Sequence, residues 1–211
     1  DMIKGVAWAR EKKCRVISIS ASGPSEDPAM QDIIWESHTQ SKDSIVFVAS
    51  SGNTGKEEYR YSSCSDGVLG VSALNYSKGK YTISPRSTYN DRIDLAAPGS
   101  SIYTLSHKDN TSAATLGASS AATPYVAGVA ALVLQINPSL TARECAQILT
   151  STATDAGTKG YDKHYGYGII NPLKAVQKAL YKTNSKAQKI TGISSSYKKT
   201  YTASAFTLQP K

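Results

Sequence analysis

The stretch ASSAATPYVAGVAALVLQINP, residues 118–138, decides how this chain folds. Nearly every residue after Ser120 is small or apolar, and a segment with almost no polar face is typical of a helix buried on all sides. Proline is tolerated only near the start of such a helix, so Pro124 predicts a helix that begins within a few residues of Ser120. We therefore predict that Ser120 caps this helix, beside unpaired backbone N–H groups and the positive end of the helix dipole.

The segments on either side alternate between helix and strand patterns. Thr141 and Glu144 have the spacing of a capping box, and Pro172 stands where a first helical turn accepts proline. An alternation of helices and short β-branched runs predicts an α/β domain. The expected helices cover 1–13, 31–42, 141–153 and 171–182, and the expected strands cover 14–20, 43–53, 67–74, 81–86 and 92–99.

The formal net charge of +8 is concentrated in one part of the chain. Residues 163–211 hold nine lysines and no acidic residue, whereas residues 1–162 hold fifteen basic and sixteen acidic residues. No arginine-rich or aromatic-interleaved pattern accompanies the lysines, so we predict no nucleic-acid partner. A basic tail suits an anionic surface such as a cell wall, or serves solubility alone. No stretch approaches the length of a membrane span.

The three cysteines point to no metal site. Cys14, Cys64 and Cys145 lack metal-like spacing with one another or with histidine, and at most one internal disulfide can form. Cys14 precedes an expected strand and Cys145 lies in an expected amphipathic helix, so both are interpreted as structural thiols.

The segment around Ser120 resembles the nucleophile motif of the subtilisin family of serine peptidases, G-T-S-M-A-x-P-H-V-A-G. Ser120 takes the place of the nucleophile, and Pro124 and the Val-Ala-Gly run match outright. Ala118 replaces a glycine beside the reacting centre, and Ala121 also departs from the motif. Tyr125 replaces a motif histidine that is not the catalytic base, so the nucleophile itself is retained.

Further segments resemble the same family in the same order. VFVASSGN ends in Asn53, at the place of the asparagine that completes the oxyanion hole in the family. The resemblance covers roughly residues 1–180. It implies a three-layer α/β fold with a mostly parallel central sheet, lacking its N-terminal strands, and makes 1–183 the C-terminal part of a peptidase domain. The other matching segments are VISISASG, YSSCSDGVLGVSALN, RIDLAAPGSSIYT and YGYGIINPLKAV.

The resemblance also implies a cleft that binds a polypeptide substrate as an extended strand. One wall of its primary specificity pocket is formed by Ser20, Ala21 and Ser22, and the other by Ser50, Ser51 and Gly52. Ser22 replaces a glycine and narrows the entrance, while Ser50 and Ser51 replace alanines and make the wall more polar. We expect a modest-sized or uncharged residue before the scissile bond.

The base that would activate Ser120 is not found in this chain. In the family the triad follows the order Asp, His, Ser, and the three histidines here, His38, His107 and His164, are not in a matching motif. We interpret them as surface or loop histidines and expect Asp and His on a preceding segment, so that this chain alone is inactive. Two alternatives remain open: a pseudoprotease that binds proteins, and a structural or adhesive cell-surface segment.

We expect neither a cofactor nor a metal. Many subtilisins bind structural calcium, but Ser62 replaces the proline of the turn near the family's weak site. Residues 184–211 are rich in Ser, Thr, Lys and Tyr and are interpreted either as a linker or as the start of an immunoglobulin-like surface module. Such a tail favours an extracellular or cell-surface protein.

Overall fold

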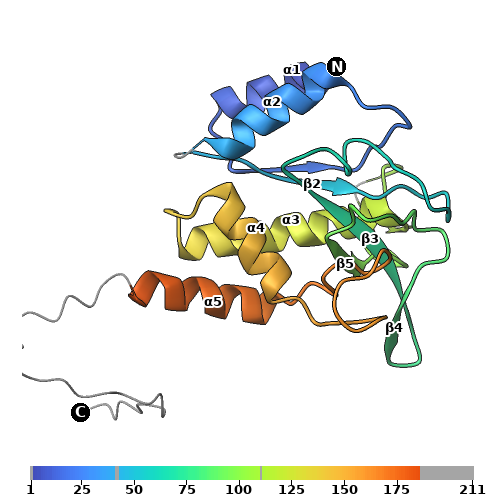
Figure 1. Ribbon diagram of the computed structural model, residues 1–211. Helices are drawn as coiled ribbons and strands as arrows, with labels where there is room; N and C mark the ends of the chain where they lie inside the picture. Colours follow the sequence, from blue (N-terminus) through green and yellow to red (C-terminus); the bar gives the residue numbers. More distant parts are fainter. Residues whose placement is uncertain (1, 41–42, 110, 186–211) are drawn as a thin grey trace, which may run out of the picture.

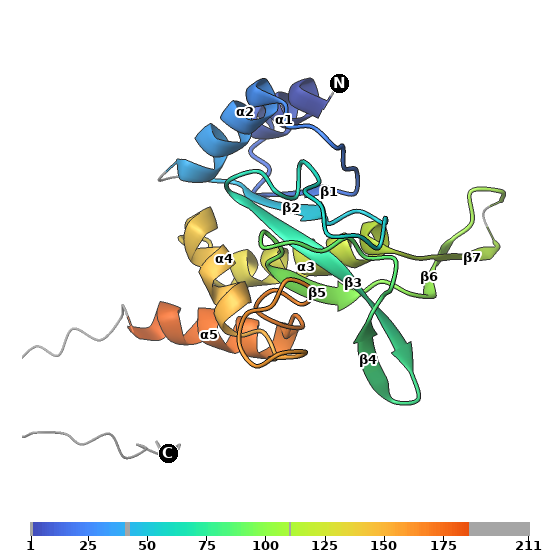
Figure 2. The ribbon, with the colours of Figure 1, turned by 45° about the vertical axis from the view of Figure 1, so that its right-hand side comes forward.

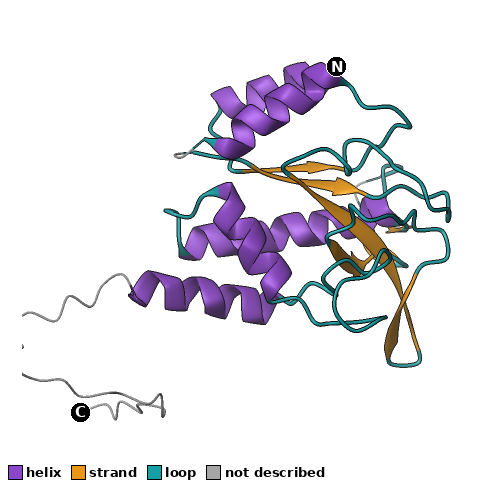
Figure 3. Ribbon diagram, viewed as in Figure 1, coloured by secondary structure: helices purple, strands orange, loops and turns teal. Residues whose placement is uncertain are grey.

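A central sheet lies between two layers of helices in the computed structural model, which describes residues 2–40, 43–109 and 111–185 (Figure 1). Helices α1 and α2 cover one face of the sheet and α3, α4 and α5 lie on the other (Figure 3). The expected three-layer α/β fold is therefore confirmed. The elements are α1 (Met2–Glu11), β1 (Val16–Ile19), α2 (Pro28–Thr39), β2 (Val46–Ser50), β3 (Val68–Ser77), β4 (Lys80–Ile83), β5 (Leu95–Pro98), β6 (Ile102–Leu105), β7 (Ala113–Leu116), α3 (Ser119–Ile136), α4 (Ala142–Ser151) and α5 (Pro172–Ser185).

The sheet is mostly parallel, as expected. Strands β1, β2, β3 and β5 run parallel to their neighbours in that order, with Ile19 opposite Ala49 and Ser50 opposite Val71. Strand β4 is antiparallel to the far half of β3. Parallel strands end at the same edge of a sheet, so the residues that follow β1 and β2 emerge close together. This edge positions the candidate site.

Strand β2 is buried on both faces. Val46 and Val48 belong to the core shared with α3, α4 and α5, whereas Phe47 and Ala49 belong to the core shared with α1 and α2. Side chains alternate between the faces of a strand, so one continuous apolar run supplies both cores. Each large apolar side chain buried in this way stabilises the fold by about 1.5–3 kcal/mol.

Helix α3 begins at Ser119, within the range that Pro124 predicted. The prediction that Ser120 caps the helix is wrong, because the N-cap residue is Ala118 and Ser120 lies in the first turn. The prediction of burial on all sides is also wrong. One stripe of the helix faces solvent, and it consists of Pro124, Tyr125, Gly128, Ala131, Leu132 and Gln135.

By length and composition alone, the same helix could cross a membrane, contrary to the expectation that no stretch approaches this length. It has 18 residues and a mean hydropathy of 1.4. Half of it is buried, and it packs against β2, β3 and β5 and against α4 and α5. Its apolar composition is accounted for by this packing.

Two elements differ from the sequence-based expectations, namely the start of α2 and the hairpin of β6 and β7. Helix α2 starts earlier than expected because Asp27 accepts hydrogen bonds from the N–H groups of Ala29 and Met30, with Pro28 at the first position. The hairpin of β6 and β7 was not expected, and it projects from the body of the domain (Figure 2). The capping box of Thr141 and Glu144 is confirmed at the start of α4.

The expected tail lies almost entirely outside the described residues. Helix α5 continues to Ser185, just past the expected boundary between 183 and 184. The expectations for the rest of 184–211, a linker or the start of a surface module, stay predictions.

Candidate active site

Ser120 lies against the segment that leaves β1. Its Oγ donates a hydrogen bond to the carbonyl of Ser20 at 3.2 Å, and Ser20 Oγ donates to the carbonyl of Ser120 at 3.0 Å. This reciprocal pair fixes the first turn of α3 next to one predicted wall of the specificity pocket. The Ser120 side chain is half-buried, so it remains accessible from the cleft side.

Asn53 is held by the residue before Ser120. Its Oδ1 accepts hydrogen bonds from Ser119 N at 3.0 Å and from Ser119 Oγ at 2.8 Å. Because both donors meet the carbonyl oxygen, this network assigns the amide orientation and leaves the Nδ2 hydrogens for another acceptor. Asn53 is exposed, so this acceptor can come from a bound molecule. The structure thus brings the predicted nucleophile and the predicted oxyanion donor together.

Ala118 adopts a backbone conformation that is ordinarily reserved for glycine. Its φ of 79° and ψ of −174° fall in a region where a Cβ atom is strained, at a cost of about 1–3 kcal/mol. The substitution of glycine by alanine that was noted in the sequence therefore has a structural consequence. The strain sits directly before Ser119 and Ser120.

The residues of the two predicted pocket walls differ in solvent exposure. Ser20 and Ala21 are exposed at the end of β1, and Ser22 is half-buried. Ser50 and Ser51 are 2% and 0% exposed, so the expectation that their hydroxyls make the wall polar is wrong. The Ser51 hydroxyl instead lies 3.1 Å from Ser87 Oγ in the interior.

Gly52, the remaining residue of that wall, has a φ of +98°, which favours glycine. Its carbonyl accepts hydrogen bonds from Ser119 Oγ at 3.1 Å and from Thr88 N at 3.1 Å. A cavity of about 470 Å³ borders Asn53 and Ala118 on the side of Arg86 and Gly99. Its volume lies within the range of about 300–1,000 Å³ that is common for ligand sites.

Two residues of the site were missed in the sequence. Ser119 was given no role, yet it orients Asn53 and joins α3 to the end of β2. Arg60 was not considered, although its Nη2 donates to the carbonyl of Ser22 at 3.3 Å. Its position directly before the matched segment that begins with Tyr61 could have indicated a role in the site.

In the described part of the chain, none of the three histidines forms a hydrogen bond with Ser120. The Ser120 hydroxyl bonds the carbonyl of Ser20 instead. His107 and His164 are exposed, and the His164 ring packs on Tyr89 with ring centroids 4.0 Å apart. His38 differs from the expectation of a surface or loop residue. It is half-buried in the last turn of α2 beside the carbonyl of Ile45, and burial lowers its pKa.

The cysteines are free in the described part of the chain. Cys145 is buried in α4, and this burial raises the pKa of its thiol to about 12. A thiol with so high a pKa is inert, in agreement with a structural role.

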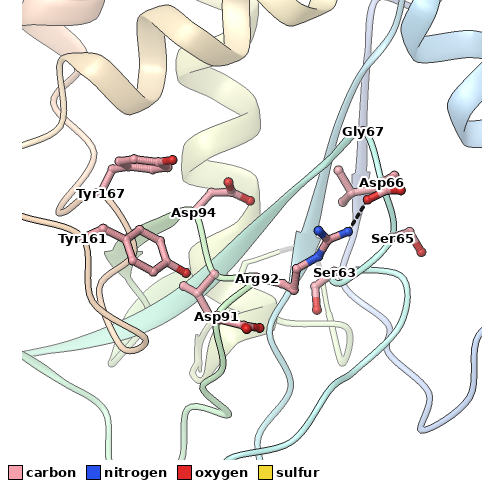
Figure 4. Close-up of a pocket in the computed structure, with 11 residues that line it drawn as sticks. Ser63, Ser65, Asp66, Gly67, Asp91, Arg92, Asp94, Tyr161 and Tyr167 are labelled. Atoms are coloured by element: carbon pink, nitrogen blue, oxygen red, sulfur yellow. Dashed lines mark hydrogen bonds and ion pairs between the residues drawn. The ribbon is translucent and has the colours of Figure 1, made fainter.

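A second cavity of about 410 Å³ lies away from Ser120, beside the loop that leads into β3 (Figure 4). Asp94 lines it beside Tyr161 and Tyr167, and its Oδ2 accepts a hydrogen bond from Gly70 N at 2.8 Å. Removal of the carboxyl from bulk water raises the pKa of Asp94 to about 7, although the Gly70 N–H and the nearby Arg92 favour its charged form.

The turn that contains Ser62 borders this cavity, and the family resemblance implies a weak calcium site near that turn. Here the Arg92 guanidinium pairs with Asp66 and donates to the carbonyl of Cys64 at 3.2 Å and 3.3 Å. The guanidinium therefore already occupies Asp66 and the Cys64 carbonyl on this side of the cavity. Across 2–40, 43–109 and 111–185 no cluster of three or more His, Cys, Asp or Glu residues suited to a metal occurs. That the protein binds no metal stays a prediction.

The sequence profile of the subtilase family matches residues 1–168. This chain belongs to the subtilase family. It is 33% identical over 180 residues to subtilisin DY of Bacillus licheniformis, and this match covers 83% of this chain and 62% of that protein. It is 30% identical to the thermostable alkaline protease of Halalkalibacterium halodurans, over 84% of this chain and 46% of that protein.

The fold of this subtilase is also found in solved structures. A lanthipeptide protease matches with a TM-score of 0.71 and 24% identity, over 84% of this chain and 65% of that one. The psychrophilic subtilisin-like protease Apa1 from an Antarctic Pseudoalteromonas matches with a TM-score of 0.71 and 15% identity, over 85% of this chain and 74% of that one. The subtilase chain therefore spans about half to two thirds of the length of its curated relatives.

Replacement of Ala118 by glycine should stabilise the protein. Relief of a strain of about 1–3 kcal/mol outweighs the roughly 0.5–1 kcal/mol that the greater freedom of an unfolded glycine costs, so we expect a gain of about 1 kcal/mol. Urea unfolding measures it. The matched change Ala131→Gly, on the exposed stripe of α3, should lower stability by about 1 kcal/mol. An Ala118→Gly variant no more stable than wild type would contradict the strain at this position.

The Asp94 carboxyl should make stability depend on pH. Its pKa of about 7 in the folded state exceeds the value of about 3.9 in an unfolded chain, so the unfolded state loses this proton first as pH rises. The contribution is fully present below about pH 4 and is lost as pH rises toward about 7. Urea unfolding of Asp94→Asn across this range should show a shallower decline than wild type. Asp32→Asn, on the exposed face of α2, should keep the wild-type slope, and equal slopes for all three proteins would contradict the prediction.

Proposed function

We propose that this chain is the C-terminal part of the catalytic domain of a serine endopeptidase of the subtilisin type. The observation that carries the proposal is the placement of Ser120 in the first turn of α3, next to an Asn53 amide whose orientation is set by Ser119. The relatives named subtilisin and alkaline protease support it. An extracellular location is also proposed, supported by a relative named minor extracellular protease in Bacillus subtilis, 29% identical over 171 residues.

The proposed reaction is hydrolysis of a peptide bond through an acyl-enzyme. A polypeptide lies extended along Ser20 to Ser22, and Ser120 Oγ attacks the scissile carbonyl as a base removes its proton. The backbone N–H of Ser120 and the Nδ2 of Asn53 stabilise the developing oxyanion. The amine leaves with a proton returned by the base, and water then releases the acyl group from Ser120.

The base is proposed to come with an aspartate on a preceding segment of the protein. Two surfaces of the chain support a partner of this kind. The exposed stripe of α3 includes Tyr125 and Leu132, which are 44% and 47% exposed, next to an apolar hollow of about 300 Å³ lined by Ile102, Leu116 and Pro124. In addition, β1 ends the path of described strands, so one of its edges has no strand partner there. A segment that covered the stripe would arrive beside Ser120.

A pseudoprotease is the second candidate function. It is favoured by the strained Ala118, which places a methyl group next to the nucleophile where a flexible glycine would let the backbone adapt. In this alternative the cleft is kept for protein contacts, and Ser120 performs no chemistry. The structural or adhesive role suggested by the tail concerns residues outside the described part.

A fluorophosphonate probe distinguishes the candidates. Full-length protein should be labelled at Ser120, whereas the present chain alone should react little because its serine has no base. Addition of the preceding segment to this chain should restore labelling. Ser120→Ala should abolish the reaction and Ser25→Ala, in an exposed loop, should not. Absence of label on the full-length protein would instead favour the pseudoprotease.

Asn53 should contribute to the rate of the full-length enzyme. Loss of one oxyanion-hole donor lowers kcat by about 10²- to 10³-fold, a magnitude that comes from the equivalent asparagine of subtilisin itself. We expect a similar loss for Asn53→Ala, with little change in KM, because the donor acts on the transition state. Steady-state kinetics with a peptide substrate measures it. A kcat within about threefold of wild type would remove Asn53 from the oxyanion hole.

A further inference from the structure

Arg60 lies between the two walls of the predicted specificity pocket. On one side its Nη2 donates a hydrogen bond to the carbonyl of Ser22 at 3.3 Å. On the other side it packs against Gly52, where an added Cβ would lie 3.0 Å from Arg60 Cγ and 3.4 Å from Ser22 Oγ. The neighbouring backbone pairing of Gly23 with Tyr61 holds Arg60 in this position.

The guanidinium of Arg60 is incompletely satisfied. Its Nε is buried and has no hydrogen-bond partner. Its Nη1 lies 3.7 Å from Glu58 Oε1, which is an ion pair but is too long for a good hydrogen bond, and that Oε1 also has no hydrogen-bond partner. An arginine carries five donors in a fixed planar fork, so the carbonyl of Ser22 accounts for only part of its capacity.

We propose that Arg60 makes this subtilase select an acidic side chain, Asp or Glu, immediately before the scissile bond. The inference rests on the proposed function, because it assigns the substrate class of the same cleft. Among the residues that form the pocket walls, Ser20 to Ser22 and Ser50 to Gly52, none carries a charge. Arg60 and its ion-pair partner Glu58 are therefore the charged groups next to these walls, and a substrate carboxylate would share the Arg60 guanidinium with Glu58.

Guanidinium and carboxylate groups match in geometry and can form two parallel hydrogen bonds. The Arg60 side chain is 22% exposed, and a substrate carboxylate can accept hydrogen bonds from the Nη donors that the carbonyl of Ser22 leaves free, whereas an aliphatic side chain cannot. Lysine or arginine at the same substrate position would bring like charges together. The expected modest size of the side chain is kept, since Arg60 itself takes up space between the walls, but the expectation of an uncharged residue is replaced.

Peptides that differ only at the residue before the scissile bond test the proposal on the full-length protein. We expect kcat/KM for Glu to exceed that for Gln by about 10-fold or more, and that for Lys by more. Arg60→Gln should remove the preference for Glu over Gln, and Arg60→Glu should shift the preference toward Lys. Arg10→Gln, which removes an exposed arginine of α1, is the matched control and should leave the profile unchanged.

Binding of cleavage products gives a second readout that does not need catalysis. Full-length Ser120→Ala protein should bind a peptide with a C-terminal Glu more tightly than the same peptide with Gln, and Arg60→Gln in that background should abolish the difference. Arg60-dependent binding without cleavage or probe labelling would support the Arg60 assignment and contradict the peptidase. Cleavage or binding that favours Lys or an aliphatic residue, and that Arg60→Gln does not alter, would overturn the assignment and leave the peptidase intact.

Discussion

The hydrogen bonds of Ser119 are the constraint on which the site depends. The Ser119 hydroxyl lies within hydrogen-bond distance of both the carbonyl of Gly52 and Oδ1 of Asn53, so its single proton is shared between these two acceptors. The backbone N–H of Ser119 donates to the same Oδ1. These contacts join the first turn of α3 to the end of β2, across the core that the helix shares with the sheet. The position of Ser120 and the direction of the Asn53 amide follow from one small residue that performs no chemistry.

Alternation of helix and strand patterns was enough to predict an α/β domain, because each element carries its own period, and the three layers came from the family resemblance. Local caps were readable in the same way, as Thr141 with Glu144 shows, and Asp27 with Pro28 would have been readable had it been used. An apolar run that is buried on both faces of a sheet does not reveal which of its side chains faces the cleft. Ser50 and Ser51 lie in such a run, and both turned out to be buried.

The candidate site also contains residues that were predicted and residues that were not. Ser120 and Asn53 were identified because a family motif surrounds each of them, and the structure brings them together. The role of Arg60 was not predicted because it depends on the pairing of Gly23 with Tyr61, which joins parts of the chain far apart in sequence. The solvent-facing stripe of α3 was missed because a helix of small apolar residues gives no sign of which face its own chain will leave open.

That open stripe links two properties of the protein that are ordinarily considered separately. A partner that covers it completes an apolar interface and, on the proposal made above, delivers the base at the same moment. Assembly and activation would then be a single thermodynamic event, with no catalytically competent state that is only half assembled. Because synthesis runs from the N-terminus, the preceding segment would exist before Ser120, and neither part would cleave peptides until the stripe is covered.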